Sequence, residues 1–271
     1  MSIDAIVAQK WSEEALILAT QMTSKLRGTV QEVQVTGADI YNFITFDNST
    51  ATVGKSRADA VTYNSQNPVK VPCQSQQIYS AFIIDNFDMA RSRIDYRNVL
   101  TKKILSDLGR QVDGIIISAM SGISGLQTVT LPTANTLNNA GMNAMAMALS
   151  AFDVENEDRY MVTHTGGMKH MATDSTIANN FAIQDQVVRK GYVTNIQGFN
   201  VIEHNYLPVP TAGQHKRFGY QKNSVGLAVF QDIQLKFDWV PQQLSWQIAG
   251  YMYVGAAGLD SSRIVSANVA D

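Results

Sequence analysis

Cysteine, charge and long apolar runs are all scarce in this chain of 271 residues. Cys73 is the only cysteine, which excludes an internal disulfide framework and a zinc site built from several thiolates. No apolar run approaches the roughly 18–20 residues that a membrane-spanning helix needs. The first residues show no basic stretch followed by an apolar core, so we expect no secretory signal. We therefore expect a soluble protein made in a bacterial cytoplasm, with no membrane partner.

The charged side chains nearly cancel one another. Lys and Arg number 21 and Asp and Glu number 23, a net charge of -2, whereas a dedicated DNA-binding face usually shows a basic excess. Charged residues make up 16% of the chain, against roughly 25% in an average soluble domain. Interface cores are depleted in charge. The composition therefore favours a subunit of an assembly, although compositional drift explains it equally simply.

Apolar residues recur at three- and four-residue spacing between residues 11 and 26, which predicts an amphipathic helix. Trp11, Leu18 and Met22 lie on its apolar stripe, and Gly28 marks its expected end. An apolar stripe on an N-terminal helix needs a partner surface. We predict that Trp11, Leu18 and Met22 contact neighbouring subunits.

The sequence pattern changes over residues 29–80. β-forming residues there are spaced by Thr, Asn, Gly and Asp, and no helical period is present. This pattern predicts a long two-stranded ribbon. Two strands alone are marginally stable in water. We therefore expect the ribbon to lie on its own domain or on a neighbouring subunit.

The longest helical pattern in the chain covers about residues 93–120 and follows a predicted buried strand at 78–84. Gly109 and Gly114 lie inside this helix, where glycine is unfavourable. They predict close packing or a slight bend.

The second half of the chain is predicted to be mixed and then mostly β. A loop at 121–138 leads to a Met- and Ala-rich helix at 139–152, whose apolar residues, Met147 included, are expected to form ordinary core. The further predicted elements are a strand at 160–163, a short helix at 166–172 and mainly strands from residue 191 onward.

Motifs for catalysis or cofactor binding are missing. The chain has no Walker A pattern, no GxGxxG after a strand and no GxSxG. His164, His170 and Asp174 make a conceivable metal cluster, but the spacing of the two histidines is wrong for one helix face. A basic loop predicted at 215–217 is more simply solvated than bound to a phosphate. We predict no catalytic residue, no metal and no cofactor.

Charge gathers in one place. Six basic residues and five aspartates lie between Asp85 and Asp113, with both signs interspersed. This pattern favours either ion pairs between subunits or a solvated, salt-bridged helix face. We predict inter-subunit ion pairs at the start of this cluster, at Asp85, Asp88, Arg91, Arg93, Asp95 and Arg97.

The order of these elements resembles that of the major capsid proteins of tailed bacteriophages, which have the Hong Kong 97-type fold. Four segments carry the resemblance together, although each is weak alone. They are the apolar strand and acidic turn at 83–90, the Arg-led strand at 159–163, the Gly-Phe-x-Val hairpin within 191–208 and the near-terminal strand at 249–256.

The resemblance implies an α+β fold in four parts. These are an N-arm (1–27), an extended loop (28–78), a peripheral domain (79–138 and 231–271) that carries the spine helix, and an axial domain (139–230).

The resemblance also implies a structural protein rather than an enzyme. Hexamers and pentamers of the chain would form the icosahedral shell around a phage double-stranded DNA genome, within the virion. The implied partners are other copies of the chain, a portal and a separate scaffolding protein, with a decoration protein as a further candidate. The net charge of -2 predicts sparse, non-specific and salt-labile contacts with DNA.

Two other classes remain as alternatives. A tail-tube protein also self-assembles, but tail-tube subunits are mainly β and the helix at 93–120 argues against that class. A mixed α/β enzyme needs a convergent set of titratable groups, and the sequence offers none above background.

Overall fold

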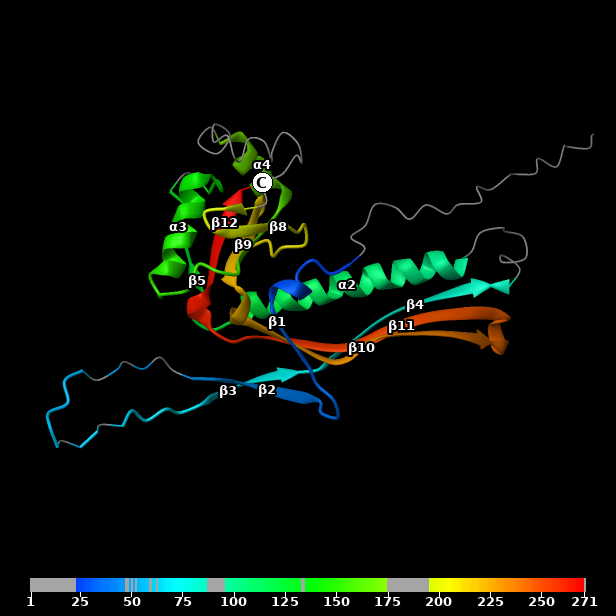
Figure 1. Ribbon diagram of the computed structural model, residues 1–271. Coiled ribbons are helices and arrows are strands. Elements are labelled where there is room, and N and C mark those ends of the chain that lie inside the picture. The colour runs from blue at the N-terminus through cyan, green and yellow to red at the C-terminus, as the bar shows by residue number, and fades with distance from the viewer. Residues whose placement is uncertain are drawn as a thin grey trace, which may run out of the picture.

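The computed structural model describes residues 23–46, 49, 51, 53–58, 60–61, 63–86, 96–132, 135–174 and 195–270. Within these residues the chain forms two larger sheets, three α-helices and a two-stranded ribbon (Figure 1). The fold class is α+β, as predicted.

A four-stranded sheet with one long helix forms the first half of the body. Helix α2 (Tyr96–Gly122) lies along one face of the sheet (Figure 1). Its stripe of Ile104 and Leu108 packs on Gly250, where a Cβ would come within 2.3 Å of Ile104. The strand order is β1 (Gln31–Gln34), β10 (Val225–Val240), β11 (Ser245–Gly258) and β4 (Gln76–Asp85), with β1 parallel to β10 and the other pairs antiparallel.

A six-stranded sheet with two shorter helices forms the second half. Helices α3 (Asn139–Ser150) and α4 (Thr165–Thr173) contribute Met142, Met145 and Met171 to a core that also contains Phe199. The strand order is β5 (Gln127–Thr128), β12 (Ile264–Ala270), β9 (Gln214–Gln221), β6 (Arg159–Thr163), β8 (Phe199–Glu203) and β7 (Asn195–Ile196).

Short 3-10 turns connect these parts. The turn η2 (Lys222–Ser224) joins β9 to β10, and η4 (Ser261–Arg263) lies between β11 and β12. Both therefore link the two sheets. The remaining turns are η1 (Arg27–Thr29), ahead of β1, and η3 (Pro241–Gln243), between β10 and β11.

The ribbon consists of the antiparallel strands β2 (Ile40–Thr45) and β3 (Val69–Gln74) with residues 46–68 between them. It extends away from both sheets (Figure 1). The described residues between the two strands contain no helix and no strand. The predicted ribbon is therefore present but shorter than predicted, since β1 and β4 belong to the four-stranded sheet.

Three predictions about local structure are wrong. Residues 23–26 do not continue a helix but bend into η1, and the earlier part of the predicted helix lies outside the described residues. The strand predicted as buried at 78–84 is instead the edge strand β4, whose side chains alternate between exposed and partly buried. Residues 215–217 lie in β9 rather than in a loop, and Arg217 is fully buried.

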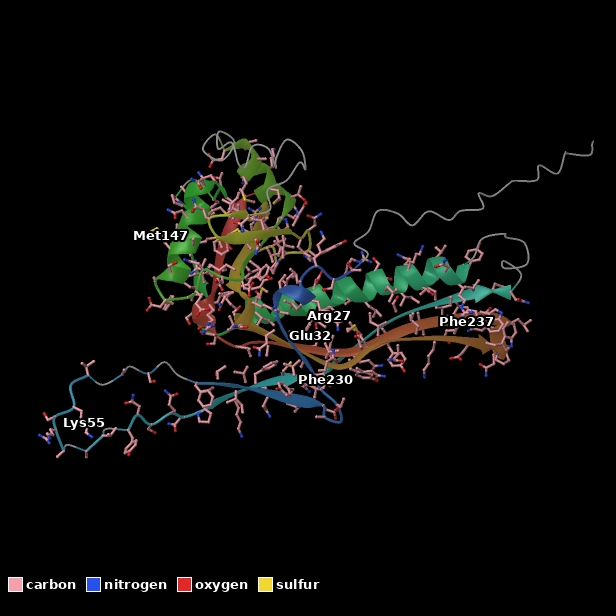
Figure 2. All side chains as sticks on the ribbon, in the orientation of Figure 1. Arg27, Glu32, Lys55, Met147, Phe230 and Phe237 are labelled. Atoms are coloured by element: carbon pink, nitrogen blue, oxygen red, sulfur yellow. The ribbon has the colours of Figure 1, made fainter. Side chains whose placement is uncertain are left out.

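One further expectation, on Met147, is wrong, and the strand pairing crosses the expected domain boundaries. Met147 was expected in the core, but it lies on the outer face of α3 and is exposed (Figure 2). Residues 264–270 and 127–128 were expected in the same domain as the long helix; β12 pairs with β5 and with β9 of the six-stranded sheet. Residue 230, a predicted boundary, lies inside the continuous strand β10.

Candidate assembly surfaces

The ribbon exposes large apolar side chains along its length. Val53 is 92% exposed, Tyr63 88% and Phe46 65%, and Ile44 and Val61 are also exposed. Lys55 lies at the far end of the ribbon (Figure 2). Several large apolar side chains exposed on one projecting segment favour contact with another protein surface.

The base of the ribbon, in contrast, is packed firmly against the body. Phe43 and Cys73 are buried with Ala228 and Ala257 in a small core. At Gly226 a Cβ would lie 2.4 Å from the Phe43 ring, and at Gly255 it would lie 2.3 Å from the carbonyl oxygen of Gln74. Burial raises the pKa of the Cys73 thiol, which is expected for an unreactive packing residue.

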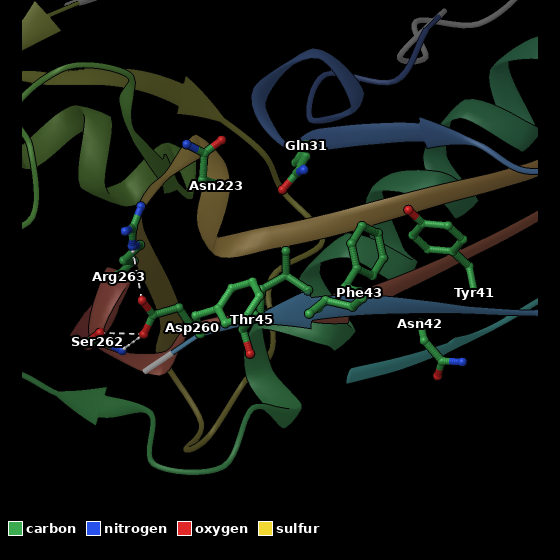
Figure 3. A pocket seen from close by; sticks show the side chains of 12 residues that line it. Gln31, Tyr41, Asn42, Phe43, Thr45, Asn223, Asp260, Ser262 and Arg263 are labelled. Carbon is green, nitrogen blue, oxygen red and sulfur yellow. Dashed lines mark hydrogen bonds and ion pairs between the residues drawn. The ribbon is translucent and has the colours of Figure 1, made fainter. Parts of the chain in front are cut away.

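A groove of about 810 Å³ lies between β2 and the turn η4 (Figure 3). On the ribbon side, Tyr41 and Phe43 line it with their rings edge to face, 4.9 Å between centroids. On the body side, Asp260 accepts hydrogen bonds from the Ser262 N–H at 2.9 Å and from Arg263 Nε at 3.1 Å. The groove therefore offers one aromatic and one charged wall beside the root of the ribbon.

Residues 23–29, here called the root segment, hold the start of the described chain against the body. The carboxylate of Asp113, in the middle of α2, accepts hydrogen bonds from the Ser24 hydroxyl at 2.6 Å and the Leu26 N–H at 3.0 Å. Leu26 is fully buried in the first core. The root segment therefore anchors the beginning of the described chain on the body.

An ion-pair group follows the root segment on the surface. Arg27 Nη2 lies 2.7 Å from Glu32 of β1, and Arg27 Nη1 lies 3.2 Å from Asp232 of β10. Figure 2 shows Arg27 and Glu32 beside α2. The hydrogen bond from Arg27 lowers the pKa of the Asp232 carboxyl. Because the side chains are partly exposed, these pairs contribute at most about 1 kcal/mol each.

Of the six residues predicted to form ion pairs between subunits, the structure describes only Asp85 and Arg97. Both are exposed, at the end of β4 and in the first turn of α2, which lie at the same end of the body (Figure 1). Arg97 lies 4.8 Å above the centre of the Phe237 ring. The other predicted contact residues lie outside the described residues: Trp11, Leu18, Met22, Asp88, Arg91, Arg93 and Asp95.

The face of the four-stranded sheet opposite α2 carries exposed aromatic residues that the sequence analysis missed. Tyr79 of β4 is 75% exposed and faces Tyr251 of β11 across the strand pair. Lys236 Nζ lies 5.6 Å from the centre of the Tyr251 ring. The period-two alternation of residues 77–85 was the signal that could have identified this face.

The candidate metal residues do not form a metal site in the part of the chain that the structure describes. His164 instead stacks on His215, with 4.1 Å between ring centroids. None of the described helices combines the length and the apolar character needed to cross a bilayer.

Comparisons with known proteins agree on one kind of protein. A family described as phage capsid protein matches residues 3–270. No curated protein sequence matches the chain.

Solved structures of several phage capsids share the fold. The capsid protein of cyanophage P-SCSP1u matches with a TM-score of 0.73 at 15% identity, covering 98% of this chain and 94% of that one. The capsid protein of Ralstonia phage GP4 gives 0.74 at 13% identity, covering 100% and 97%. That of Helicobacter pylori bacteriophage KHP30 gives 0.75 at 9% identity, covering 99% and 97%.

Proposed function

This chain belongs to the phage capsid protein family and is a structural protein of a virion shell, and we propose that its copies assemble as hexamers and pentamers into an icosahedral shell around double-stranded DNA. The ribbon is the observation that supports this proposal. Val53, Tyr63 and Phe46 lie in water in a single copy. Full burial of one such side chain is worth roughly 1.5–3 kcal/mol, so contact with a neighbouring copy is strongly favoured.

We assign the parts of the chain to roles in that shell. Residues 1–27 form the N-arm and residues 28–78 the extended loop, of which the ribbon is the outlying portion. The four-stranded sheet with α2 corresponds to the peripheral domain, and the six-stranded sheet corresponds to the axial domain. The strand pairing supports placing β5 and β12 in the axial part.

Contacts between copies are proposed at three places. The N-arm contributes Trp11, Leu18 and Met22. The charge cluster contributes ion pairs, with Asp85 and Arg97 exposed at one end of the body in support. The ribbon and the aromatic face around Tyr79 contribute apolar area.

Further partners follow from the same proposal. A portal occupies one vertex of the shell, and a separate scaffolding protein guides assembly in the host bacterial cytoplasm; a decoration protein is a third candidate. The net charge of -2 supports weak, salt-labile contact with the packaged DNA. As a structural protein, the chain has no catalytic role.

Deleting residues 1–22 tests this function. Residues 23–27 must remain, because Leu26 belongs to the core and Ser24 binds Asp113. We expect a folded subunit that melts within a few degrees of the intact chain but forms no closed shells in negative-stain micrographs.

A matched control replaces residues 1–22 by a Gly/Ser segment of equal length. It should also fail to form shells, because the side chains rather than the chain length make the contact. Normal shells from either variant would contradict the proposed role of the N-arm.

A further inference from the structure

Asp113 is a buried carboxylate in the interior of a long helix. Its side chain is fully inaccessible to water, and burial of a charge is costly unless hydrogen bonds compensate. Oδ1 accepts from the Ser24 hydroxyl at 2.6 Å and the Leu26 N–H at 3.0 Å, and Oδ2 accepts from the Lys25 N–H at 3.1 Å. One carboxylate therefore binds three consecutive residues of the root segment.

The surface of α2 is shaped to allow this contact. Gly109 lies one turn before Asp113, and a Cβ there would be 2.8 Å from the Ser24 nitrogen. The root segment is also tied to the second sheet, since Lys25 Nζ donates to the Glu203 carbonyl at 2.9 Å. Thr29 Oγ1 lies 2.6 Å from the Tyr220 hydroxyl. The root segment thus bridges the two halves of the body.

His204 is a second buried titratable residue beside the Asp113 carboxylate. It is 1% exposed, and its Nε2 lies 3.4 Å from Asp113 Oδ2. Neither ring nitrogen has a hydrogen-bond partner among the described residues. A neutral imidazole buried in this way leaves polar atoms unsatisfied, whereas a protonated one places a positive charge directly beside the carboxylate.

Asp113 is the carboxylate nearest to His204, and several other titratable groups lie on the elements around it. The Tyr206 ring centre is 6.0 Å away, and the backbone N–H of His204 donates to the Thr163 carbonyl at 2.9 Å. The charged or titratable residues on the elements around it include Asp113 and Arg110 on α2, Lys25 on the root segment, Glu203 and Tyr206 on its own segment, Arg159, Tyr160 and His164 on or after β6, and His215, Lys216, Arg217 and Tyr220 on β9; Arg110 hydrogen-bonds Tyr206.

We propose that Asp113 and His204 form a proton-controlled latch on the root segment. Histidine changes charge between pH 5 and 8. Protonation of His204 gives Asp113 Oδ2 a charged partner, keeps the carboxylate ionised and strengthens its hold on Ser24, Lys25 and Leu26. Loss of that proton weakens the hold. The latch rests on the proposed function only in that residues 1–22, which precede the root segment in the sequence, serve assembly.

Hydrogen exchange of the full-length chain tests the latch without requiring shells. The protection factor of the Lys25 and Leu26 amides, corrected for intrinsic exchange, should rise about tenfold between pH 8 and pH 6, because a positive charge beside Asp113 Oδ2 favours the carboxylate that accepts their hydrogen bonds. The His204→Gln variant should keep the pH 8 level throughout. The Asp113→Asn variant should be less protected at both pH values.

A control variant tests whether the pH dependence is specific to His204, and a second measurement tests it without any substitution. His215→Asn removes another half-buried histidine, on β9, and should leave the pH dependence intact. In the unsubstituted chain, the amide NMR shifts of Lys25 and Leu26 should follow the same transition, which requires no variant to fold. A flat profile in the unsubstituted chain, or an unchanged rise in His204→Gln, would overturn the latch. Shell formation by these proteins is scored separately and bears only on the proposed function.

Discussion

Gly109, Gly226 and Gly255 each lie where another segment comes so close that no Cβ would fit without movement. At Gly109 and Gly255 the neighbouring atoms are backbone atoms of Ser24 and Gln74, and at Gly226 they belong to the Phe43 ring. Backbone cannot rotate away as a flexible side chain can. These glycines therefore set the distance at which the root segment and the ribbon pack on the body.

Two glycines of α2 offer a matched comparison. Gly109→Ala should lower the free energy of unfolding by about 1–3 kcal/mol, because the new methyl group would overlap the root segment. Gly114→Ala meets nothing within 4 Å and should raise it by up to about 1 kcal/mol through helix propensity. Urea unfolding of both variants measures the difference. Changes of the same sign would show that the root segment does not pack as described.

From the sequence, these two glycines predicted close packing or a slight bend, and nothing in the pattern distinguished one glycine from the other. The structure shows that Gly109 packs closely and that Gly114 does not. The distinction depends on Ser24, which is far away in sequence. The same holds for Asp113 and His204, because helical periodicity assigns Asp113 to a polar position and says nothing about a distant histidine. Neither residue of the latch could be predicted from local pattern.

At the scale of elements, long periodic segments were predicted well. Helix α2, helix α3 and strands β6 and β11 lie close to their predicted positions because each has an apolar pattern set by its own residues. Residues 215–217 were predicted as a loop because they are polar, but they belong to strand β9, in which Arg217 is buried. The prediction that β4 is buried was wrong, because β4 lies at the edge of its sheet and the strand order cannot be inferred from the residues of β4 alone.

We predict that the outlying part of the ribbon contributes little to the stability of the folded subunit, whereas its packed base contributes much. Replacing residues 46–68 by a short Asn-Gly turn should change the free energy of unfolding by less than about 1 kcal/mol, since the described residues removed are almost all exposed. Phe43→Ala, at the packed base, should cost about 3–5 kcal/mol. Chemical unfolding and electron microscopy together check this prediction. A large loss of stability from the loop replacement alone would show that the ribbon stabilises its own body.

At the scale of the whole molecule, the division into two sheets was only partly predictable. Sequence order places residues 264–270 after the strands of the first sheet, yet β12 pairs with β9 in the second. Pairings across such separations are set by the whole fold. The family resemblance nevertheless identified the α+β fold and the capsid class, because it used the order of elements rather than their contacts.

The charge cluster makes a prediction for the assembled shell. Arg97→Glu should block shell formation, because reversal places like charges at a contact between copies. Dispersed subunits should lose only about 1 kcal/mol, the value of the lost contact with Phe237. Electron microscopy and thermal unfolding measure the two effects.

Lys102→Glu is the matched control, because it makes the same charge change at an exposed position further along α2. It should still form shells. Restoration of assembly in Arg97→Glu by Asp85→Lys would identify the ion pair. If Arg97→Glu assembles normally at physiological salt, the charge cluster does not form the proposed contact.

The strand order of the first sheet also determines when a newly made copy becomes usable. Strand β1 pairs with β10, and β4 pairs with β11, so strands from the first third of the chain pair with strands near its end. On the ribosome, the ribbon emerges long before the glycines of β10 and β11 that receive its base. A polypeptide interrupted before residue 258 cannot complete this sheet or seat its ribbon. Packing of the ribbon base on the body therefore has to wait until β11, which ends at Gly258, has been synthesised.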